Sequence, residues 1–218
     1  MADCCNDKAC AIEALRTKQS ATLRIVLAIN VVMFVVEFAS GLMARSTALL
    51  SDSLDNLGDA TTYALSLYVV SRSTRAKARV ALFKGMLILG AALFVLARIG
   101  YALVNPSVPV FEAMGIVSLI ALAANGTCLA LLWKHREDDV NMSSVWECSR
   151  NDIAANTAVL LAAALVWLSG AAWPDLAVGI ALVALLLRSA VKVSAGALRE
   201  LRSDAPHFAS VTRQVRKS

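Results

Sequence analysis

Three aspartates are spaced so that their side chains share one face of a helix. Asp52, Asp55 and Asp59 stand three and four residues apart, which places them on one stripe together with Asn56. The surrounding stretch, Thr47–Val70, is long enough to cross a bilayer as a helix. A charged side chain at the centre of a membrane helix costs about 2.5–3.5 kcal/mol on insertion scales, so carboxylates placed there usually have a function. The stripe is therefore a candidate ion-binding site.

A second stripe of the same kind follows almost a hundred residues later. Cys148, Asp152 and Asn156 are four residues apart, so a thiol, a carboxylate and an amide share one helical face. If the two stripes face each other, Asp55 and Asp59 near the middle of their span complete a cage of three carboxylates and a thiol. Such groups cannot all be ionised in a low-dielectric interior without a cation. The oxygen and sulfur donors favour Zn(II) or the softer Cd(II), and metal binding that releases protons allows metal to exchange for protons.

Other polar residues in the apolar stretches have more than one interpretation. Glu37 shares a helical face with Asn30 and is either a proton carrier or a structural partner of another helix. Asp52, at the outer end of its stripe, is a group at the mouth of the ion path, a helix cap or a hydrogen-bond partner. Asn156 is an accessory candidate beside Asp152.

Charged residues near the ends of the apolar stretches have simpler explanations. Glu112 and Asp175 fall in the first turns of their helices, where negative charge is favoured, and are expected to cap or to reach the headgroups. Lys84 and Arg98 are expected to extend along their helix to the membrane surface. None of these four is expected to bind the ion.

The helices that must position these groups follow from composition. Of the 218 residues, 58% are apolar and 17% charged, whereas soluble domains average about 45–50% and 25%, so a soluble globular protein is excluded. We expect an all-α membrane protein with six spanning helices. The predicted spans are Leu23–Met43, Thr47–Val70, Val80–Val104, Val110–Trp133, Ser143–Leu165 and Asp175–Ala195. The odd-numbered loops are short, and proline is expected to end the helices beside the last two of them, Asn105–Pro109 and 166–174.

The basic residues set the orientation. They gather before the first span, in the even-numbered loops and after the last span, so both termini are expected in the cytoplasm. The net charge of +5 therefore reflects topology, and without interleaved aromatic residues it predicts no nucleic-acid partner. The sequence has no glycine-rich nucleotide-binding loop, so we expect neither an enzyme nor a resident cofactor, and any transport must use an ion gradient.

The chain divides into three parts by composition. Residues 1–22 form a cytoplasmic segment whose Cys4, Cys5 and Cys10 either pass soft metal ions to the site or belong to an unstructured leader. Residues 23–195 form the transmembrane domain. Residues 196–218 form a short basic tail attracted to anionic lipid.

Two motifs resemble those of the cation diffusion facilitator family. The stretch from Ser46 to Asp59, with its Ala-Leu-Leu run before the acidic residues, is similar to the second-helix signature of that family, and Cys148 to Asn156 is similar to its fifth helix. Asn30, Glu37 and Gly41 also resemble its first helix. The resemblance covers about residues 23–200 and implies the transmembrane fold of this family.

The resemblance also implies a site and an activity. The implied metal ligands are Asp55, Asp59, Cys148 and Asp152. The implied activity is export of Zn(II), with Cd(II) as a second substrate, by proton antiport in the plasma membrane as a multi-pass protein. Family members are usually homodimers, and here dimerisation would rest on the spans, because the customary cytoplasmic domain after the sixth helix is not expected in so short a chain. Cys148 stands where the family usually has histidine, which predicts a softer site.

Two other functions remain open from the sequence. The first is a transport-inactive membrane protein that binds metal and regulates a partner. The second is a proton-coupled exporter of organic cations, in which Asp55 and Asp59 would bind the charge and Tyr63 and Tyr68 would supply aromatic contacts.

Overall fold

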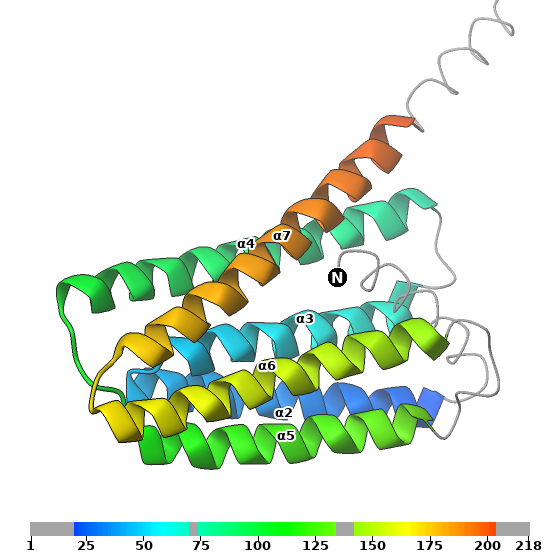
Figure 1. Ribbon diagram of the computed structural model, residues 1–218. Helices are drawn as coiled ribbons and strands as arrows, with labels where there is room; N and C mark the ends of the chain where they lie inside the picture. Colours follow the sequence, from blue (N-terminus) through cyan, green and yellow to red (C-terminus); the bar gives the residue numbers. More distant parts are fainter. Residues whose placement is uncertain (1–19, 70–73, 134–141, 204–218) are drawn as a thin grey trace, which may run out of the picture.

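The protein is a bundle of long antiparallel helices in the computed structural model (Figure 1). The structure describes residues 20–69, 74–133 and 142–203, and for some of them, residues 142–151 included, the backbone alone. Its helices are α2 (Ser20–Ala44), α3 (Thr47–Val69), α4 (Thr74–Val104), α5 (Phe111–Trp133), α6 (Met142–Ser169) and α7 (Trp173–Ser203). Each of the six predicted spans thus corresponds to one helix, and the described residues contain no strand. The cysteine-containing segment and the end of the basic tail lie outside the described residues.

Five of these helices are long and apolar enough to cross a membrane, and α3 is the exception. Its sequence carries three aspartates and many hydroxyl and amide side chains. The reason that α3 tolerates them is its surroundings, because it packs against α2, α4, α6 and α7. Residues 46–54 are all buried, so the side chains in the first half of α3 do not face lipid. We therefore count α3 as the sixth span, shielded from lipid by its neighbours.

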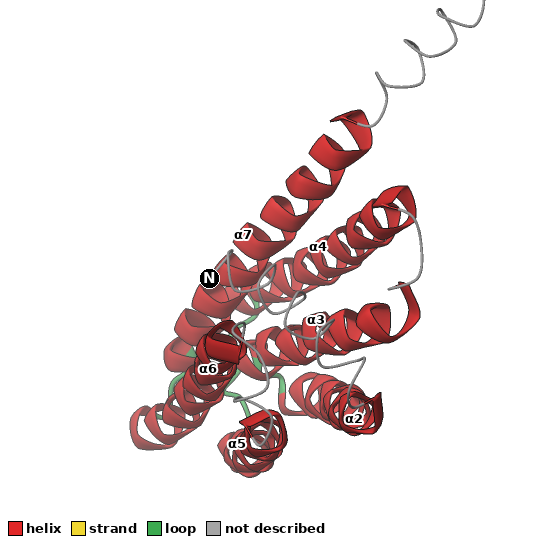
Figure 2. Cartoon of the chain, turned by 90° about the vertical axis from the view of Figure 1, so that its right-hand side faces the viewer, coloured by secondary structure: helices red, strands yellow, loops and turns green. Residues whose placement is uncertain are grey.

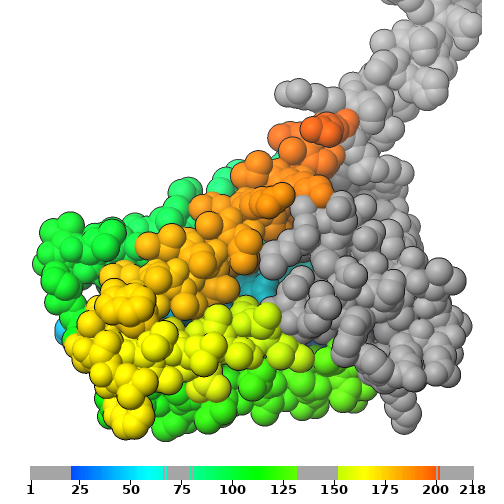
Figure 3. Space-filling view, viewed as in Figure 1, coloured from blue at the N-terminus to red at the C-terminus, as the bar shows by residue number. Residues whose placement is uncertain are grey.

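The helices form two groups, which the end-on view separates (Figure 2). The first group contains α2, α3, α5 and α6, and α4 and α7 lie together across one side of it. In the space-filling view, α6 and α7 cover most of α3 on the visible face, and its atoms are visible mainly between them (Figure 3). The inner faces of α3 thus lie between the two groups.

Two apolar clusters flank α3 in its first half. One contains Leu49 together with residues of α5 and α6, and the other contains Leu50 and Leu54 together with residues of α4 and α7. Each cluster joins α3 to a different pair of neighbours, and both consist of aliphatic side chains packed away from solvent. The polar stripe of α3 therefore runs along a helix whose position is fixed on two sides.

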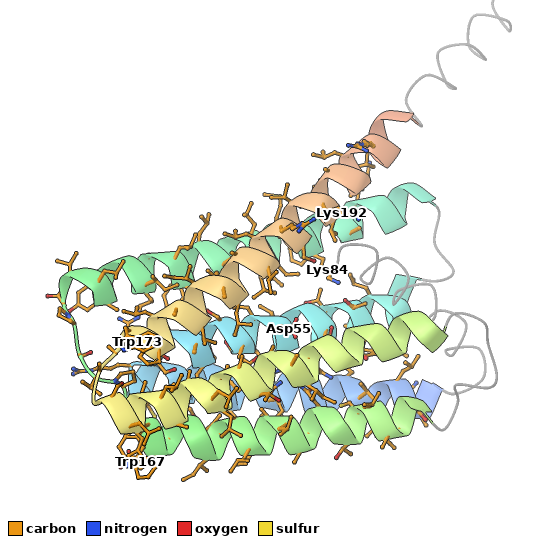
Figure 4. All side chains as sticks on the ribbon, viewed as in Figure 1. Asp55, Lys84, Trp167, Trp173 and Lys192 are labelled. Carbon is orange, nitrogen blue, oxygen red and sulfur yellow. The ribbon has the colours of Figure 1, made fainter. Side chains whose placement is uncertain are left out.

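The first and last described helices place both ends of the described chain on one side of the bundle, as an even number of spans requires. The start of α2 and the end of α7 lie at the same end of the bundle (Figure 1), and most described basic side chains belong to this end of their helices. At the other end, here called the outer end, the connections are 45–46, 105–110 and 170–172. Trp167 and Trp173 are exposed there (Figure 4), as expected for aromatic residues at a membrane surface.

One predicted helix boundary is wrong. Pro174 was expected to terminate a helix, but it is the second residue of α7, and the loop before it is only 170–172. Proline fits the first turn of a helix because its missing N–H would have no partner there. The helix before this loop ends instead at Ser169, and the next residue, Gly170, has a φ of 61°, the left-handed conformation common just after a helix.

Candidate functional site

The start of α3 is held by a carboxylate from a distant helix. Asp175 of α7 accepts hydrogen bonds from the backbone N–H of Thr47 at 2.7 Å and of Ala48 at 3.1 Å. It also accepts from the hydroxyls of Ser46 at 2.5 Å and Thr47 at 2.8 Å. Ser46 is itself the N-cap, because its Oγ accepts from the N–H of Leu49 at 3.1 Å. The first N–H groups of α3 therefore all have partners, although they lie deep in the structure.

Asp175 was expected in the first turn of its helix, as a cap or reaching the headgroups; it does lie in the first turn of α7, but it does not reach the headgroups. Its side chain is 1% exposed and caps α3 instead. The negative charge faces the positive end of the α3 dipole, which is a favourable arrangement. The beginning of α3 is thereby attached to the beginning of α7.

Two glycines allow backbones to approach closely beside this cap. A Cβ atom at Gly179 of α7 would lie 2.9 Å from the carbonyl carbon of Thr47 and 2.7 Å from its Oγ1. A Cβ atom at Gly41 of α2 would lie 2.9 Å from Cγ of Leu50. All three distances are too short for a real Cβ atom. In addition, Ser51 donates to the carbonyl of Gly179 at 3.0 Å, which binds α3 to α7 one turn further along.

A buried pair joins α2 to α3 deeper in the bundle. Asn56 Nδ2 donates to Glu37 Oε2 at 2.9 Å, and the two side chains are 3% and 0% exposed. Glu37 is therefore at least a structural partner of α3, one of the two roles open from the sequence. Further along α2, Asn30 Nδ2 donates to the carbonyl of Val26 and lies 3.9 Å from Cys128 Sγ.

Asp52 is buried beside this pair. It is 1% exposed, and neither of its carboxylate oxygens has a hydrogen-bond partner among the described residues. Asp52 lies within electrostatic reach of Glu37 and of Asp152, and Glu37 lies within electrostatic reach of Asp55. Asp52 does not cap α3, because Ser46 and Asp175 do so. Asp52 of α3 thus lies in the interior within electrostatic reach of a carboxylate of α2 and a carboxylate of α6.

The structure places three of the four predicted metal ligands. Asp55, Asp59 and Asp152 are all partly buried, and Figure 4 shows Asp55 between the ribbons of α3 and α6. The backbone of Cys148 belongs to α6, but its side chain lies outside the described part. Among the side chains that are described, no three of the types His, Cys, Asp and Glu lie close enough together to hold a metal ion. The four-ligand site therefore stays a prediction.

Lys84 contradicts its expected role. It is 8% exposed, and its ammonium group donates to the Thr62 hydroxyl of α3 (Figure 4). The side chain therefore turns into the bundle rather than running out to the membrane surface. Thr62 in turn donates to the carbonyl of Gly58, and it follows Asp59 by three residues, about one helical turn.

Some relevant residues gave little signal in the sequence. Ser118 of α5 is fully buried with a hydroxyl that has no partner, yet a serine in an apolar helix is common. The link from Asn56 to Glu37 required knowledge of which helix lies beside α3. Polar residues at i, i+4 positions of neighbouring spans are the sequence feature that could have suggested this hydrogen bond between α2 and α3.

The geometry defines a polytopic helical membrane protein with carboxylates buried in its interior. A family model described as the cation efflux transmembrane domain matches residues 23–202, so the chain belongs to the cation efflux family, also called the cation diffusion facilitators.

Two curated relatives agree with this assignment. The metal cation efflux system protein CzcD of Cupriavidus metallidurans (strain ATCC 43123 / DSM 2839 / NBRC 102507 / CH34) is 24% identical over 173 residues, which cover 73% of this chain and 54% of the relative. The cation efflux system protein CzcD of Alcaligenes sp. (strain CT14) matches with the same identity and the same coverage. The chain spans about half the length of these relatives.

Proposed function

We propose that this protein exports divalent transition-metal ions, Zn(II) and Cd(II), from the cytoplasm across the plasma membrane in exchange for protons. The observation that supports the proposal best is the acidic stripe of α3, which lies inside the bundle, with Asp52 within electrostatic reach of Glu37 of α2 and Asp152 of α6. Membership of the cation efflux family and the names of its metal-exporting relatives point the same way.

The proposed transport site consists of Asp55, Asp59, Cys148 and Asp152. Three carboxylates and a thiolate would carry more negative charge than the two positive charges of the metal ion balance. Such a site is not stable when it is fully ionised and empty, so it holds either metal or protons. Metal arriving from the cytoplasm displaces protons, and protons arriving from outside displace metal. An inward proton gradient then drives metal outward.

The same proposal covers the partners. The helices expose large apolar side chains on their outward faces, as lipid contact requires; on α4 they include Phe83, Leu93 and Phe94. A homodimer formed through the membrane helices would cover part of this surface. The number of chains in each protein particle can be measured in detergent by light scattering.

Flux through proteoliposomes tests the proposal. The purified chain is reconstituted, an inward proton gradient is imposed, and movement of Zn(II) and Cd(II) is followed with a fluorescent indicator. We expect gradient-dependent flux in the parent and a loss of about 10–100-fold or more in the Asp59→Asn and Asp152→Asn variants, because even residues behind the ligands have effects of that size. Parent-like flux in both variants, correctly inserted, would refute the site.

A matched control is available at the outer end. Glu112 is an exposed carboxylate in the first turn of α5, so Glu112→Gln removes one negative charge without touching the interior. This variant should transport like the parent. Metal binding measured by calorimetry without any flux would favour the transport-inactive alternative.

The organic-cation alternative loses support from Tyr63. This residue is 2% exposed and packs in an apolar cluster with Leu23, Val26 and Cys128. An aromatic cage for an organic cation needs the ring faces to line the binding site. Tyr63 contributes its ring to packing between α2, α3 and α5, and the side chain of Tyr68 lies outside the described part.

A further inference from the structure

Buried oxygen atoms without hydrogen-bond partners are concentrated in the group formed by α2, α3, α5 and α6. Of six such polar atoms among the described residues, five belong to this group, and all five are oxygens. They are Glu37 Oε1, both carboxylate oxygens of Asp52, Ser118 Oγ and Asn156 Oδ1. A buried polar group without a partner costs about 1–3 kcal/mol, and more when it is charged, so five of them in one region require an explanation.

Three of these side chains are linked through their neighbours. Asp52 lies within electrostatic reach of Glu37, whose other oxygen accepts from Asn56 one turn along α3. Asn156 donates its Nδ2 to the Asp152 carbonyl at 2.9 Å, which leaves its Oδ1 turned away from its own backbone. Asp152 also lies within electrostatic reach of Asp52, and α6 packs against α3. The unpartnered oxygens of α2, α3 and α6 therefore belong to one region.

This region lies outward of the predicted transport ligands. Asp52 precedes Asp55 by three residues and Asp59 by seven on a helix that begins at the outer end, so it lies roughly 4–5 Å closer to that end than Asp55 and roughly 10 Å closer than Asp59. Asn156 follows Asp152 by four residues on a helix that runs toward the outer end, so it lies about 6 Å closer to that end than Asp152. An ion leaving the transport site would meet these groups next.

We propose that Glu37, Asp52 and Asn156 form a second binding site for a divalent metal ion, on the exit side of the transport site. The proposal deepens the proposed function and rests on it for the direction of ion movement. Two carboxylates match the charge of a divalent ion, and the amide oxygen adds a neutral ligand. All donors are oxygen, which suits hard or borderline cations, whereas the predicted transport site contains a thiol.

A protonated Asp52 would explain these atoms less completely. One proton neutralises the carboxyl and supplies a single donor for Glu37 Oε1, but it leaves the second Asp52 oxygen and Asn156 Oδ1 as acceptors with nothing to accept. A metal ion interacts with all of these oxygens at once. The two explanations differ in whether the region binds a metal ion after the transport ligands have been removed.

Binding of Mn(II) to the purified full chain tests the site. Mn(II) prefers oxygen ligands and is visible by electron paramagnetic resonance. In an Asp59→Asn/Asp152→Asn background we expect about one Mn(II) per chain to remain bound. Adding Asp52→Asn or Glu37→Gln should weaken this binding at least about tenfold, in the range known for residues around metal sites. Adding Glu112→Gln should leave it unchanged.

Measurements of thermal unfolding distinguish the loss of a metal ligand from misfolding of the variant. Because Asp52 has no hydrogen-bond partner to lose, Asp52→Asn should keep or raise the Tm of the metal-free protein, while the rise in Tm on adding Mn(II) disappears. A structural role would instead lower the metal-free Tm. The proposal is overturned if the background variant binds no Mn(II), or if binding survives both Asp52→Asn and Glu37→Gln.

The two failures can be told apart. If the parent shows no flux but Mn(II) binding still depends on Asp52 and Glu37, then export fails and the second site stands as a binding site. If flux depends on Asp59 and Asp152 but Mn(II) binding does not depend on Asp52, then the proposed export is supported and the second site is refuted.

Discussion

Asp175 and Thr47, which are 128 residues apart in the chain, join the starts of two helices. The carboxylate accepts from both the backbone N–H and the hydroxyl of Thr47, at 2.7 and 2.8 Å, and it is almost fully buried. Since α3 carries the acidic stripe, this contact fixes the outer end of the stripe relative to α7. The outer end of α3 should therefore move together with α7 in any conformational change.

Removing this cap should destabilise the protein markedly. Asp175→Ala leaves two backbone N–H groups and two hydroxyls without their acceptor, and a hydrogen bond to a charged group contributes about 1.5–3 kcal/mol. We expect a loss of at least about 2 kcal/mol, seen as a lower Tm in detergent. Asp175→Asn, which keeps one acceptor oxygen, should have a Tm between those of the parent and of Asp175→Ala. Glu112→Ala is the control, since an exposed acid in a first turn contributes only about 0.3–1 kcal/mol; equal losses in the two alanine variants would contradict the capping role.

The contact of α7 with α3 should not accept a methyl group. Gly179→Ala would place a Cβ atom 2.9–3.0 Å from backbone atoms of Thr47, so the helices must separate. Overpacking of this kind costs about 1–3 kcal/mol. Gly90→Ala in α4 meets no atom within 4 Å and should leave the Tm unchanged or slightly raised. If both variants melted alike, the close approach would not matter for stability.

Hydropathy predicted most of the fold, because a spanning helix must satisfy its backbone internally and be apolar over about 20 residues. The predicted span Thr47–Val70 ends within one residue of α3, and Val80–Val104 shares its end with α4. The sequence did not predict the full length of α7, which continues to Ser203. Polar residues beyond the membrane continue a helix as readily as they end it.

The polar contacts were harder to predict, since they depend on which helices are neighbours. The i, i+4 spacing correctly placed Asp52 and Asn56 on one face but gave no partner for either. Asp175 and Lys84 were misjudged for the same reason, because a charged residue near a helix end has the same local sequence whether it faces lipid headgroups or another helix. Burial and partner depend on packing between spans far apart in the chain.

The contact between Lys84 and Thr62 should be measurable by a double-mutant cycle. Thr62→Val keeps the shape of the side chain but removes the acceptor of a buried ammonium, so we expect a loss of about 1–2 kcal/mol. In a Lys84→Met background the same change should cost clearly less, leaving mainly the lost bond from Thr62 to the Gly58 carbonyl. Unfolding in detergent gives both values. An identical cost in the two backgrounds would mean that the residues are not coupled.

Cys148 should set the preference of the transport site between metals. A thiolate favours Cd(II) more than an imidazole does, so Cys148→His should reduce Cd(II) flux relative to Zn(II) flux. The measurement is the ratio of the two fluxes in proteoliposomes under the same proton gradient. Cys128 supplies the control, because it is a buried thiol of α5 that lies beside Asn30 and outside the proposed ligand set. Cys128→Ser should leave the ratio as in the parent. If Cys148→His also left the ratio unchanged while both ions still moved, the thiol would have no part in metal selectivity, and the carboxylates alone would have to account for it.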